Sequence, residues 1–239
     1  MTVEQPKSEQ IFWSQRWQEG STGWDLGGAH PGLLEAMNLL QRIHLEDQAT
    51  YPKTKARPSI RNAYVPGCGR AHDVAWLAQF KPTSDERMWQ QVVGADFAPE
   101  AIQEASTLYG QVPGVRLRCE DATVVPTEER GTFDLVFDRA MLCALKPELR
   151  PAYMKAVVER LAPRGVHLVF LFDRIKPRYE GESPRESGPP FEIDLQLYEH
   201  LVRPLGLEVL GQKSWLTRWP SGREMSELMV VACKKANFA

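Results

Sequence analysis

The sequence lacks the usual marks of a metal-bound, disulfide-stabilised or membrane protein. Its four cysteines are separated by 24 or more residues and form no CxxC pair: Cys68, Cys119, Cys143 and Cys233. A zinc site or a compact disulfide framework requires closer pairs, so we expect reduced cysteines. The longest strongly apolar run, at 168–172, is too short to span a bilayer. The polar first ten residues argue against a secretory signal, and we expect a cytoplasmic protein.

An excess of one charge sign is also missing. The chain has 29 basic and 31 acidic residues, a net charge of −2, which argues against nucleic acid as a main partner. No HExxH motif, Ser–His–Asp pattern or paired-carboxylate signature is present, and the five histidines are scattered, so we expect no metal site. The length of 239 residues, with 43% apolar residues, is typical of a globular protein, and we predict a single domain over 1–239.

Strands and helices are expected to alternate along most of the chain. We predict strands at 62–65, 90–96, 115–119, 132–139, 165–173, 207–215 and 227–235, and helices at 31–43, 74–78, 99–110, 150–162 and 194–206. The segment 44–60 is predicted to be a linker. Repeated strand–helix units indicate an α/β fold with a mostly parallel sheet and helices on both faces. The last two strands have no helix between them and favour an antiparallel hairpin at one edge.

The first predicted strand ends in the glycine-rich turn PGCGRAHD. Gly67 and Gly69 lack side chains, so a ligand can approach the backbone closely, although glycines also form plain turns. The third glycine of a dinucleotide fingerprint would fall at His72. A bulky residue there disfavours a pyrophosphate, whereas a smaller nucleoside remains compatible.

Carboxylates follow the next strands. Asp96 ends VVGAD, where a carboxylate accepts hydrogen bonds from ribose hydroxyls; the alternative is a helix cap. Asp121 in CEDA either meets an adenine edge or caps a loop. Asp138 and Arg139 end FDLVFDR, where the strand opens on the ligand crevice; the alternative is a local ion pair.

Two further features are a tryptophan pair in the N-terminal part and a long polar segment after the fifth predicted strand. Trp13 and Trp17 are four residues apart, so a helix places them on one face. The polar segment 174–194 is too long for a tight turn, and segments of this length are often functional.

The chain resembles the thiopurine methyltransferase family, in its plant and fungal thiol and halide methyltransferase branch, over roughly residues 11–235. The motifs FWxxRWxxGxTxWDxGxxHP, VPGCGxxHD, VVGxD, FDLxFDR and GPPF occur in the family's order. The resemblance implies a Rossmann-like class I methyltransferase fold with seven strands and S-adenosyl-L-methionine as cofactor.

The resemblance also implies roles for individual residues. The implied cofactor-binding residues are Trp13, Trp17, Trp24, Gly67, Gly69, Asp96, Asp121, Ala122 and Arg139. The tryptophans cover the cofactor and offer π faces to its sulfonium, a contact of about 0.5–2 kcal/mol. Arg139 and Asp138 are the candidate catalytic residues. Pro190, Phe191 and Trp215 are the candidate substrate-binding residues, the first two in a lid over 174–194.

The sequence thus predicts an S-methyltransferase for a small-molecule thiol, acting as a monomer or weak homodimer without nucleic-acid or membrane partners. The acceptor stays open among thiols, dithiols, thiopurines, hydrosulfide, thiocyanate and halides. Two alternatives of other classes are a nicotinamide-dependent oxidoreductase, against which His72 argues, and a non-catalytic cofactor-binding regulator.

Overall fold

The computed structural model describes the backbone of residues 4–50, 61–82, 87–175, 180–181, 183–220, 222 and 224–235, and side chains from residue 9 onward except those of 43–50. The helices are α1 Glu4–Gln18, α2 Leu33–Thr50, α3 His72–Gln79, α4 Pro99–Tyr109, α5 Arg150–Arg160 and α6 Leu195–Val202. Short 3-10 helices span η1 Thr127–Glu129, η2 Leu142–Ala144, η3 Pro147–Leu149 and η4 Arg203–Leu205. The strands are β1 Asn62–Pro66, β2 Gln91–Asp96, β3 Val115–Cys119, β4 Phe133–Asp138, β5 Leu161–Arg174, β6 Leu207–Arg218 and β7 Glu224–Lys234.

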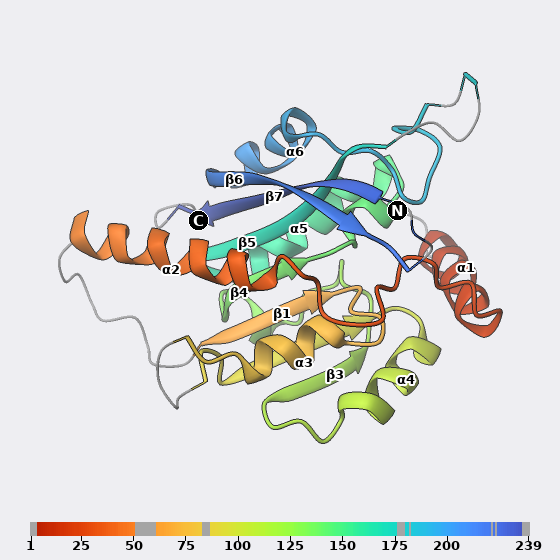
Figure 1. Cartoon of the computed structure of the whole chain (residues 1–239), viewed down its shortest axis with the longest axis horizontal. Coiled ribbons are helices and arrows are strands. Elements are labelled where there is room, and N and C mark those ends of the chain that lie inside the picture. The colour runs from red at the N-terminus through yellow and green to blue at the C-terminus, as the bar shows by residue number, and fades with distance from the viewer. Residues whose placement is uncertain are drawn as a thin grey trace.

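All seven strands form one sheet in the order β3-β2-β1-β4-β5-β7-β6 (Figure 1). Strands β1 to β5 pair in parallel, and β7 pairs antiparallel with both β5 and β6. The predicted α/β fold, its mostly parallel sheet and its antiparallel edge are therefore confirmed. Because β1 to β5 are parallel, their carboxyl ends lie along the same edge of the sheet, and α1 lies beyond that edge in Figure 1.

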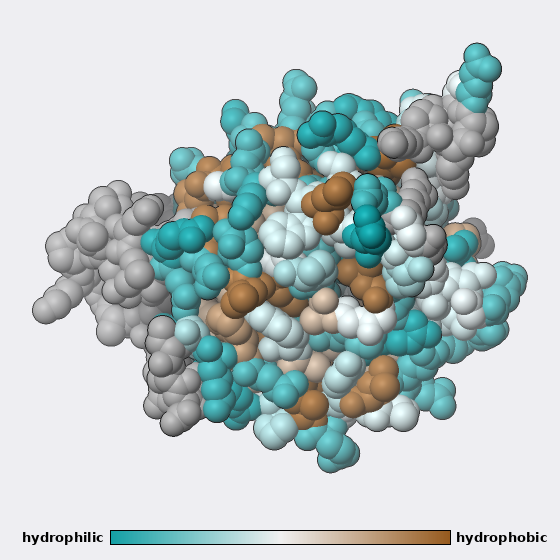
Figure 2. All heavy atoms as spheres, viewed as in Figure 1, coloured by the Kyte–Doolittle hydropathy of each residue, from teal (hydrophilic) through white to brown (hydrophobic). Residues whose placement is uncertain are grey.

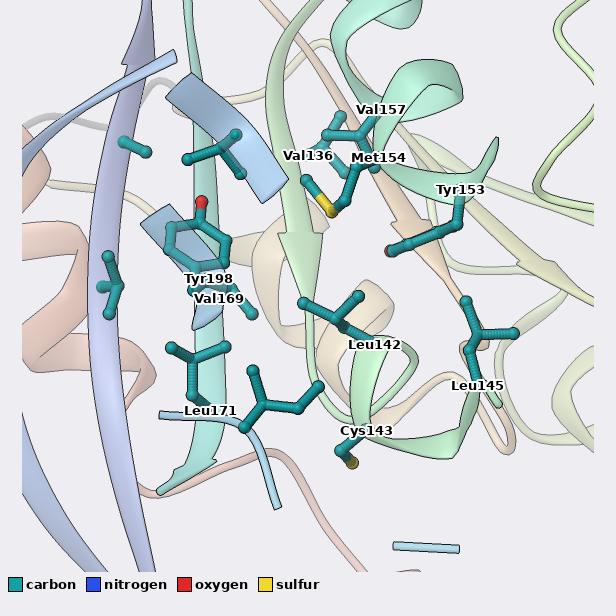
Figure 3. Packing of buried hydrophobic residues seen from close by; sticks show 14 of the residues in the cluster. Val136, Leu142, Cys143, Leu145, Tyr153, Met154, Val157, Val169, Leu171 and Tyr198 are labelled. Carbon is teal, nitrogen blue, oxygen red and sulfur yellow. The ribbon is translucent and has the colours of Figure 1, made fainter. Parts of the chain in front are cut away.

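Apolar side chains cover the sheet on both faces. On one face, Met37 of α2 and Leu77 of α3 are fully buried against the strands. Gly94 of β2 permits this close approach, since a Cβ there would lie 2.7 Å from Val74 Cγ2. On the other face, Figure 3 shows Met154 and Val157 of α5 directed toward Val136 of β4. Two layers of helices thus enclose the sheet, as its apolar strands require.

One prediction about the N-terminal part was wrong. Residues 44–50 were expected to belong to a linker, but α2 continues to Thr50. The segment HLEDQAT contains no glycine or proline, so no residue stops the helix before Pro52. The rest of the predicted linker, 51–60, lies outside the described residues, as do residues 83–86 between α3 and β2 and residues 176–179 and 182 of the predicted lid.

The helix starts follow local chemistry. Helix α5 has Pro151 in its first turn, where a missing N–H costs nothing. Helix α6 begins after Asp194, whose carboxylate accepts a 2.8 Å hydrogen bond from the Leu197 N–H.

The outer surface shown in Figure 2 is mainly polar, with apolar residues in small separate groups. Among the described residues, none of the helices has the length and apolar character needed to cross a bilayer.

Candidate functional site

A cavity of about 440 Å³ opens at the carboxyl ends of the parallel strands. Its walls come from α1, from the segment 23–28, and from the residues that follow β1, β2, β3 and β4. Phe172 of β5, Pro189, Pro190 and Trp219 close it on the side of the antiparallel strands. Its size and its place in an open α/β sheet are those of a small-molecule site.

The turn after β1 presents bare backbone to this cavity. Gly67 and Gly69 have φ values of 60° and 52°, a conformation that strains any residue with a Cβ. A Cβ on Gly67 would lie 3.0 Å from Met141 Sδ, and one on Gly69 would lie 3.5 Å from the Trp17 ring. Both glycines line the cavity.

Asp96, at the end of β2, ties two turns together. Its Oδ2 accepts a 2.9 Å hydrogen bond from the Gly69 N–H, and its Oδ1 accepts a 3.0 Å bond from the Ala98 N–H. Burial raises the pKa of this carboxyl, although the backbone hydrogen bonds act to lower it. Asp96 therefore supports the start of α4 at Ala98, and it also lines the cavity.

The loop after β3 forms the next part of the wall. Asp121 Oδ1 accepts hydrogen bonds from the Thr123 N–H at 2.8 Å and the Thr123 hydroxyl at 2.7 Å, which fixes the turn. From α5, the buried Arg160 guanidinium donates to the carbonyls of Ala122 at 2.7 Å and Val124 at 2.6 Å. The loop that carries Asp121 and Ala122 to the cavity is thus held from both sides.

Three tryptophans cover the cavity. The Trp24 ring lies edge-on to Trp13, with centroids 5.3 Å apart, and to Trp17, with centroids 5.9 Å apart. The Arg70 guanidinium lies 5.0 Å from the Trp17 ring and forms ion pairs with Asp25 and Glu104. All three indoles line the cavity, so the structure brings together the aromatic cluster predicted from the sequence.

Arg139 and Asp138, neighbours in sequence, occupy different environments. Arg139 lines the cavity with a side chain that is only 8% exposed, and its Nη2 donates to Glu227 Oε1 at 3.0 Å. Asp138 is fully buried and does not line the cavity. Its Oδ1 accepts from the Met141 N–H at 2.8 Å, and its Oδ2 accepts from the Tyr153 hydroxyl at 2.6 Å. The alternative of an Asp138–Arg139 ion pair does not hold, because each side chain has other partners.

The predicted acceptor residues are only partly brought together. Pro190 lines the cavity, but Phe191 is directed into the core, where the Arg150 guanidinium lies 5.2 Å from its ring. Trp215 lies on β6, where Lys213 and His30 approach its ring, and it does not reach the cavity. Trp219, four residues later, lines the cavity instead.

Sequence reasoning missed several residues at the site. Met141 and Phe172 line the cavity, Asp73 approaches it from α3, and Glu227 holds Arg139 from β7. Phe172 lies in a predicted strand, where an apolar residue signals only core. Glu227 is 88 positions from Arg139, and no local pattern marks it.

Two cysteines also line the cavity. Burial raises the pKa of the Cys68 and Cys143 thiols well above the ordinary value, and the nearby carboxylates Asp96 and Asp138 act in the same direction. Both thiols are therefore protonated at neutral pH and are poor nucleophiles. Figure 3 shows Cys143 at the end of the buried cluster opposite Val157.

Comparisons with known proteins agree on the family. The family model described as thiopurine S-methyltransferase matches residues 8–230. Thiocyanate methyltransferase 1 of Brassica oleracea is 31% identical over 207 residues, which cover 85% of this chain and 76% of that protein. Probable thiol methyltransferase 2 of Arabidopsis thaliana is 30% identical, covering 83% and 74%. Thiopurine S-methyltransferase of Xanthomonas campestris is 28% identical, covering 77% of each chain.

Solved structures agree on the fold. A Burkholderia thailandensis N1-methyltransferase solved with 1,6-didemethyltoxoflavin and S-adenosylhomocysteine has a TM-score of 0.63 at 15% identity, covering 98% of this chain and 92% of that one. A structure reported for the conversion of a disulfide bond into a thioacetal group in echinomycin biosynthesis has a TM-score of 0.64 at 17% identity, covering 96% and 93%. The family match excludes the oxidoreductase alternative, and the chain belongs to the thiopurine S-methyltransferase family of S-adenosylmethionine-dependent methyltransferases.

Proposed function

We propose that this enzyme transfers the methyl group of S-adenosylmethionine to the sulfur of a small-molecule thiol. The observation that carries the proposal is one continuous cavity with two unlike ends. Glycine turns and carboxylates after β1, β2 and β3 form the donor half, and Arg139 with apolar side chains near β4, β5 and β7 forms the acceptor half.

The donor half fits the cofactor's chemistry. The bare backbone at Gly67 and Gly69 leaves room that a Cβ would fill. Asp96, Asp121 and Ala122 line this half, which supports the proposal that Asp96 accepts hydrogen bonds from the ribose hydroxyls and that Asp121 and Ala122 contact the adenine. Trp13, Trp17 and Trp24 offer aromatic faces to a sulfonium, and the acidic residues of the lining also favour a cation. These tryptophans, together with the two glycines and the residues after β2 and β3 named above, form the proposed cofactor site.

The chain's own residues contribute mainly alignment and a dry environment. S-adenosylmethionine supplies an electrophilic methyl group on a positively charged sulfur. Holding donor and acceptor in line can lower the barrier by up to about 7–11 kcal/mol. A thiol with an ordinary pKa of about 8.5 is already partly ionised at neutral pH, so a strong general base is unnecessary. The Arg139 guanidinium favours the thiolate by proximity. Asp138 acts indirectly, by holding the Met141 and Leu142 amides of the loop after β4.

The acceptor half favours a thiol with an apolar body. Leu145, Leu149, Phe172, Pro190 and Trp219 line it, and Arg139 is the charged residue among them. Pro189 and Pro190 would then belong to a lid that contacts the acceptor, as the segment 174–194 was predicted to do. All four cysteines are free thiols, which fits a reducing compartment such as the cytoplasm.

Thiocyanate or a halide is a second candidate acceptor. The relatives from Brassica and Arabidopsis are named thiocyanate methyltransferases, and a buried guanidinium such as that of Arg139 attracts small anions.

The test is mass spectrometry of reactions that contain isotope-labelled S-adenosylmethionine and a mixed panel of aromatic thiols, aliphatic thiols, hydrosulfide, thiocyanate and iodide. We expect labelled methyl thioethers together with S-adenosylhomocysteine. Calorimetry with S-adenosylhomocysteine accompanies the assay. Protein that binds this product but methylates nothing in the panel would contradict the proposal and favour the regulator alternative.

A further inference from the structure

The acceptor half contains an ion pair between distant parts of the chain. Arg139 follows β4, and Glu227 lies in β7, yet Arg139 Nη2 and Glu227 Oε1 are 3.0 Å apart. The two side chains are 8% and 0% exposed. Two charges are buried at a considerable cost in solvation, and such a pair is weak evidence of a stabilising role.

Glu227 is itself held by two further donors. Its second oxygen, Oε2, lies 2.7 Å from His30 Nε2 and accepts a 3.0 Å hydrogen bond from the Thr217 hydroxyl. Burial acts to raise the pKa of Glu227, but the hydrogen bond from His30 and the charge of Arg139 outweigh it and lower the pKa. Glu227 is therefore an anion with both of its oxygens engaged.

The protonation of His30 follows from its other nitrogen. The Gly32 N–H donates a 3.1 Å hydrogen bond to His30 Nδ1, so Nδ1 carries no proton and Nε2 does. His30 thus donates to Glu227 through Nε2. Its position is fixed by the Phe170 ring, 4.2 Å away between centroids, and by a 2.7 Å bond from its backbone N–H to Asp73 Oδ1.

The guanidinium that this network holds has capacity left for a ligand. Arg139 lines the cavity, and its Nε is buried with no hydrogen-bond partner among the described residues. A buried donor without a partner costs free energy, and native proteins rarely keep one without a reason. Because the guanidinium lines the cavity and its Nη2 is held by Glu227, a ligand in the acceptor half can accept from the part of the guanidinium that faces the cavity.

We propose that Glu227, supported by His30 and Thr217, is a positioning residue that fixes the Arg139 guanidinium so that it can donate hydrogen bonds to the acceptor's sulfur. The inference rests on the proposed methyl transfer to a thiol. Because the Glu227 carboxylate already compensates the charge of Arg139, the guanidinium acts here more through directed hydrogen bonds than through net charge. The acceptor it orients is an anionic sulfur on an apolar body.

The experiment compares Glu227→Gln with Glu224→Gln as a matched control. Glu224 lies on the same strand, but its side chain is 49% exposed and pairs with Arg218 at the surface. Each variant, saturated with S-adenosylhomocysteine, is titrated with 4-nitrothiophenol, whose thiolate is yellow, and with thiocyanate. We expect Glu227→Gln to bind this thiolate at least about tenfold more weakly. We expect the affinity for S-adenosylhomocysteine to change less than about twofold, because Asp96 and Gly69 are untouched.

Turnover gives the second readout. We expect kcat/KM for the thiol to fall about 10- to 100-fold in Glu227→Gln while the KM for S-adenosylmethionine stays the same. If the wild type methylates thiols and Glu227→Gln matches it in acceptor affinity and kcat/KM, the positioning role is wrong and the proposed function stands. If the wild type neither binds nor methylates a thiol or thiocyanate, both are wrong.

Milder variants cover the case in which Glu227→Gln does not fold. Thr217→Val removes a single hydrogen bond to Glu227 at nearly constant volume, and we expect a three- to tenfold loss of thiol affinity. His30→Gln keeps a side-chain N–H donor, whereas His30→Leu does not. If His30→Gln binds the thiol more tightly than His30→Leu does, the result supports the inference. Equal losses in these two, or an unchanged Thr217→Val, contradict it.

Discussion

The two halves of the cavity are held together in different ways. In the donor half, Asp96 accepts from the Gly69 backbone 27 residues away, and both lie at the ends of adjacent strands. In the acceptor half, Arg139 is held by Glu227 from 88 residues away, and Glu227 is held by His30 from 197 residues away. The donor half therefore depends on turns that the parallel strands bring together, whereas the acceptor half depends on the final packing of the antiparallel edge.

The two halves differ in charge as well. Carboxylates, backbone amides and the guanidiniums of Arg16 and Arg70 line the donor half, a polar lining that suits a ligand with hydroxyls. Apolar side chains line the acceptor half, and its one guanidinium is matched by a buried carboxylate. Changes in one half should therefore alter the binding of one ligand and leave the other nearly unchanged, which the following variants test.

The largest effect is expected from Asp96→Asn. The amide is uncharged and has one acceptor oxygen where the carboxylate has two, so it cannot serve both the Gly69 and Ala98 N–H groups and still accept from the ribose hydroxyls as the carboxylate can. Hydrogen bonds to charged groups are worth about 1.5–3 kcal/mol each, so we expect affinity for S-adenosylhomocysteine to fall by about 100-fold or more. Calorimetry checks this, and an unchanged affinity means that the ribose lies elsewhere.

A smaller loss is expected from Arg70→Gln. Arg70 joins the turn after β1 to Asp25, Glu104 and the Trp17 ring, so its loss loosens the aromatic cover of the donor half. We expect S-adenosylhomocysteine to dissociate about tenfold faster, since a partly exposed charge network contributes about 1–2 kcal/mol. Stopped-flow tryptophan fluorescence measures the rate. A faster loss of the thiol acceptor, with the donor unaffected, would reverse our assignment of the two halves.

The acid stability of the acceptor half gives a pH test. The pKa of Glu227 is lowered from its ordinary value of 4.5, so its charge contributes stability above about pH 4.5 that is lost as pH falls through the folded pKa. Glu227→Gln has no such titration. We expect the wild type to lose about 2–4 °C more in Tm than this variant between about pH 6 and pH 3.5. Parallel curves for the two proteins in differential scanning calorimetry would show that Glu227 is not ionised as described.

The smallest effect concerns the enzyme's own thiols. Because burial raises the pKa of Cys143, we expect no methylation of this residue and no labelling by iodoacetamide in the folded protein at about pH 8. Cys119 is exposed and its pKa is raised less, so it should react first. Peptide mass spectrometry locates the labels. Modification of Cys143 ahead of Cys119 would indicate that the acceptor half opens to solvent.

Much of the donor half could be predicted because its signals are local. The glycine turn at Gly67 directly follows one strand, and the carboxylate of Asp96 ends the next strand. The two strands pair in parallel, so these two sites lie side by side. The acceptor half could be predicted only in part. Asp138 and Arg139 look equivalent in the sequence, but the packing of Tyr153 and Glu227 decides which of them reaches the cavity.

The sequence by itself determined the α/β fold, the glycine turn, the acidic strand end and the tryptophan pair, because short-range periodicity and turn chemistry fix each of them. Only the tertiary structure decided that Trp219 and not Trp215 meets the cavity, and that Glu227 faces Arg139. The register between β6 and β7 sets which side chains of that hairpin face which surface, and no local pattern encodes a partner 88 residues away.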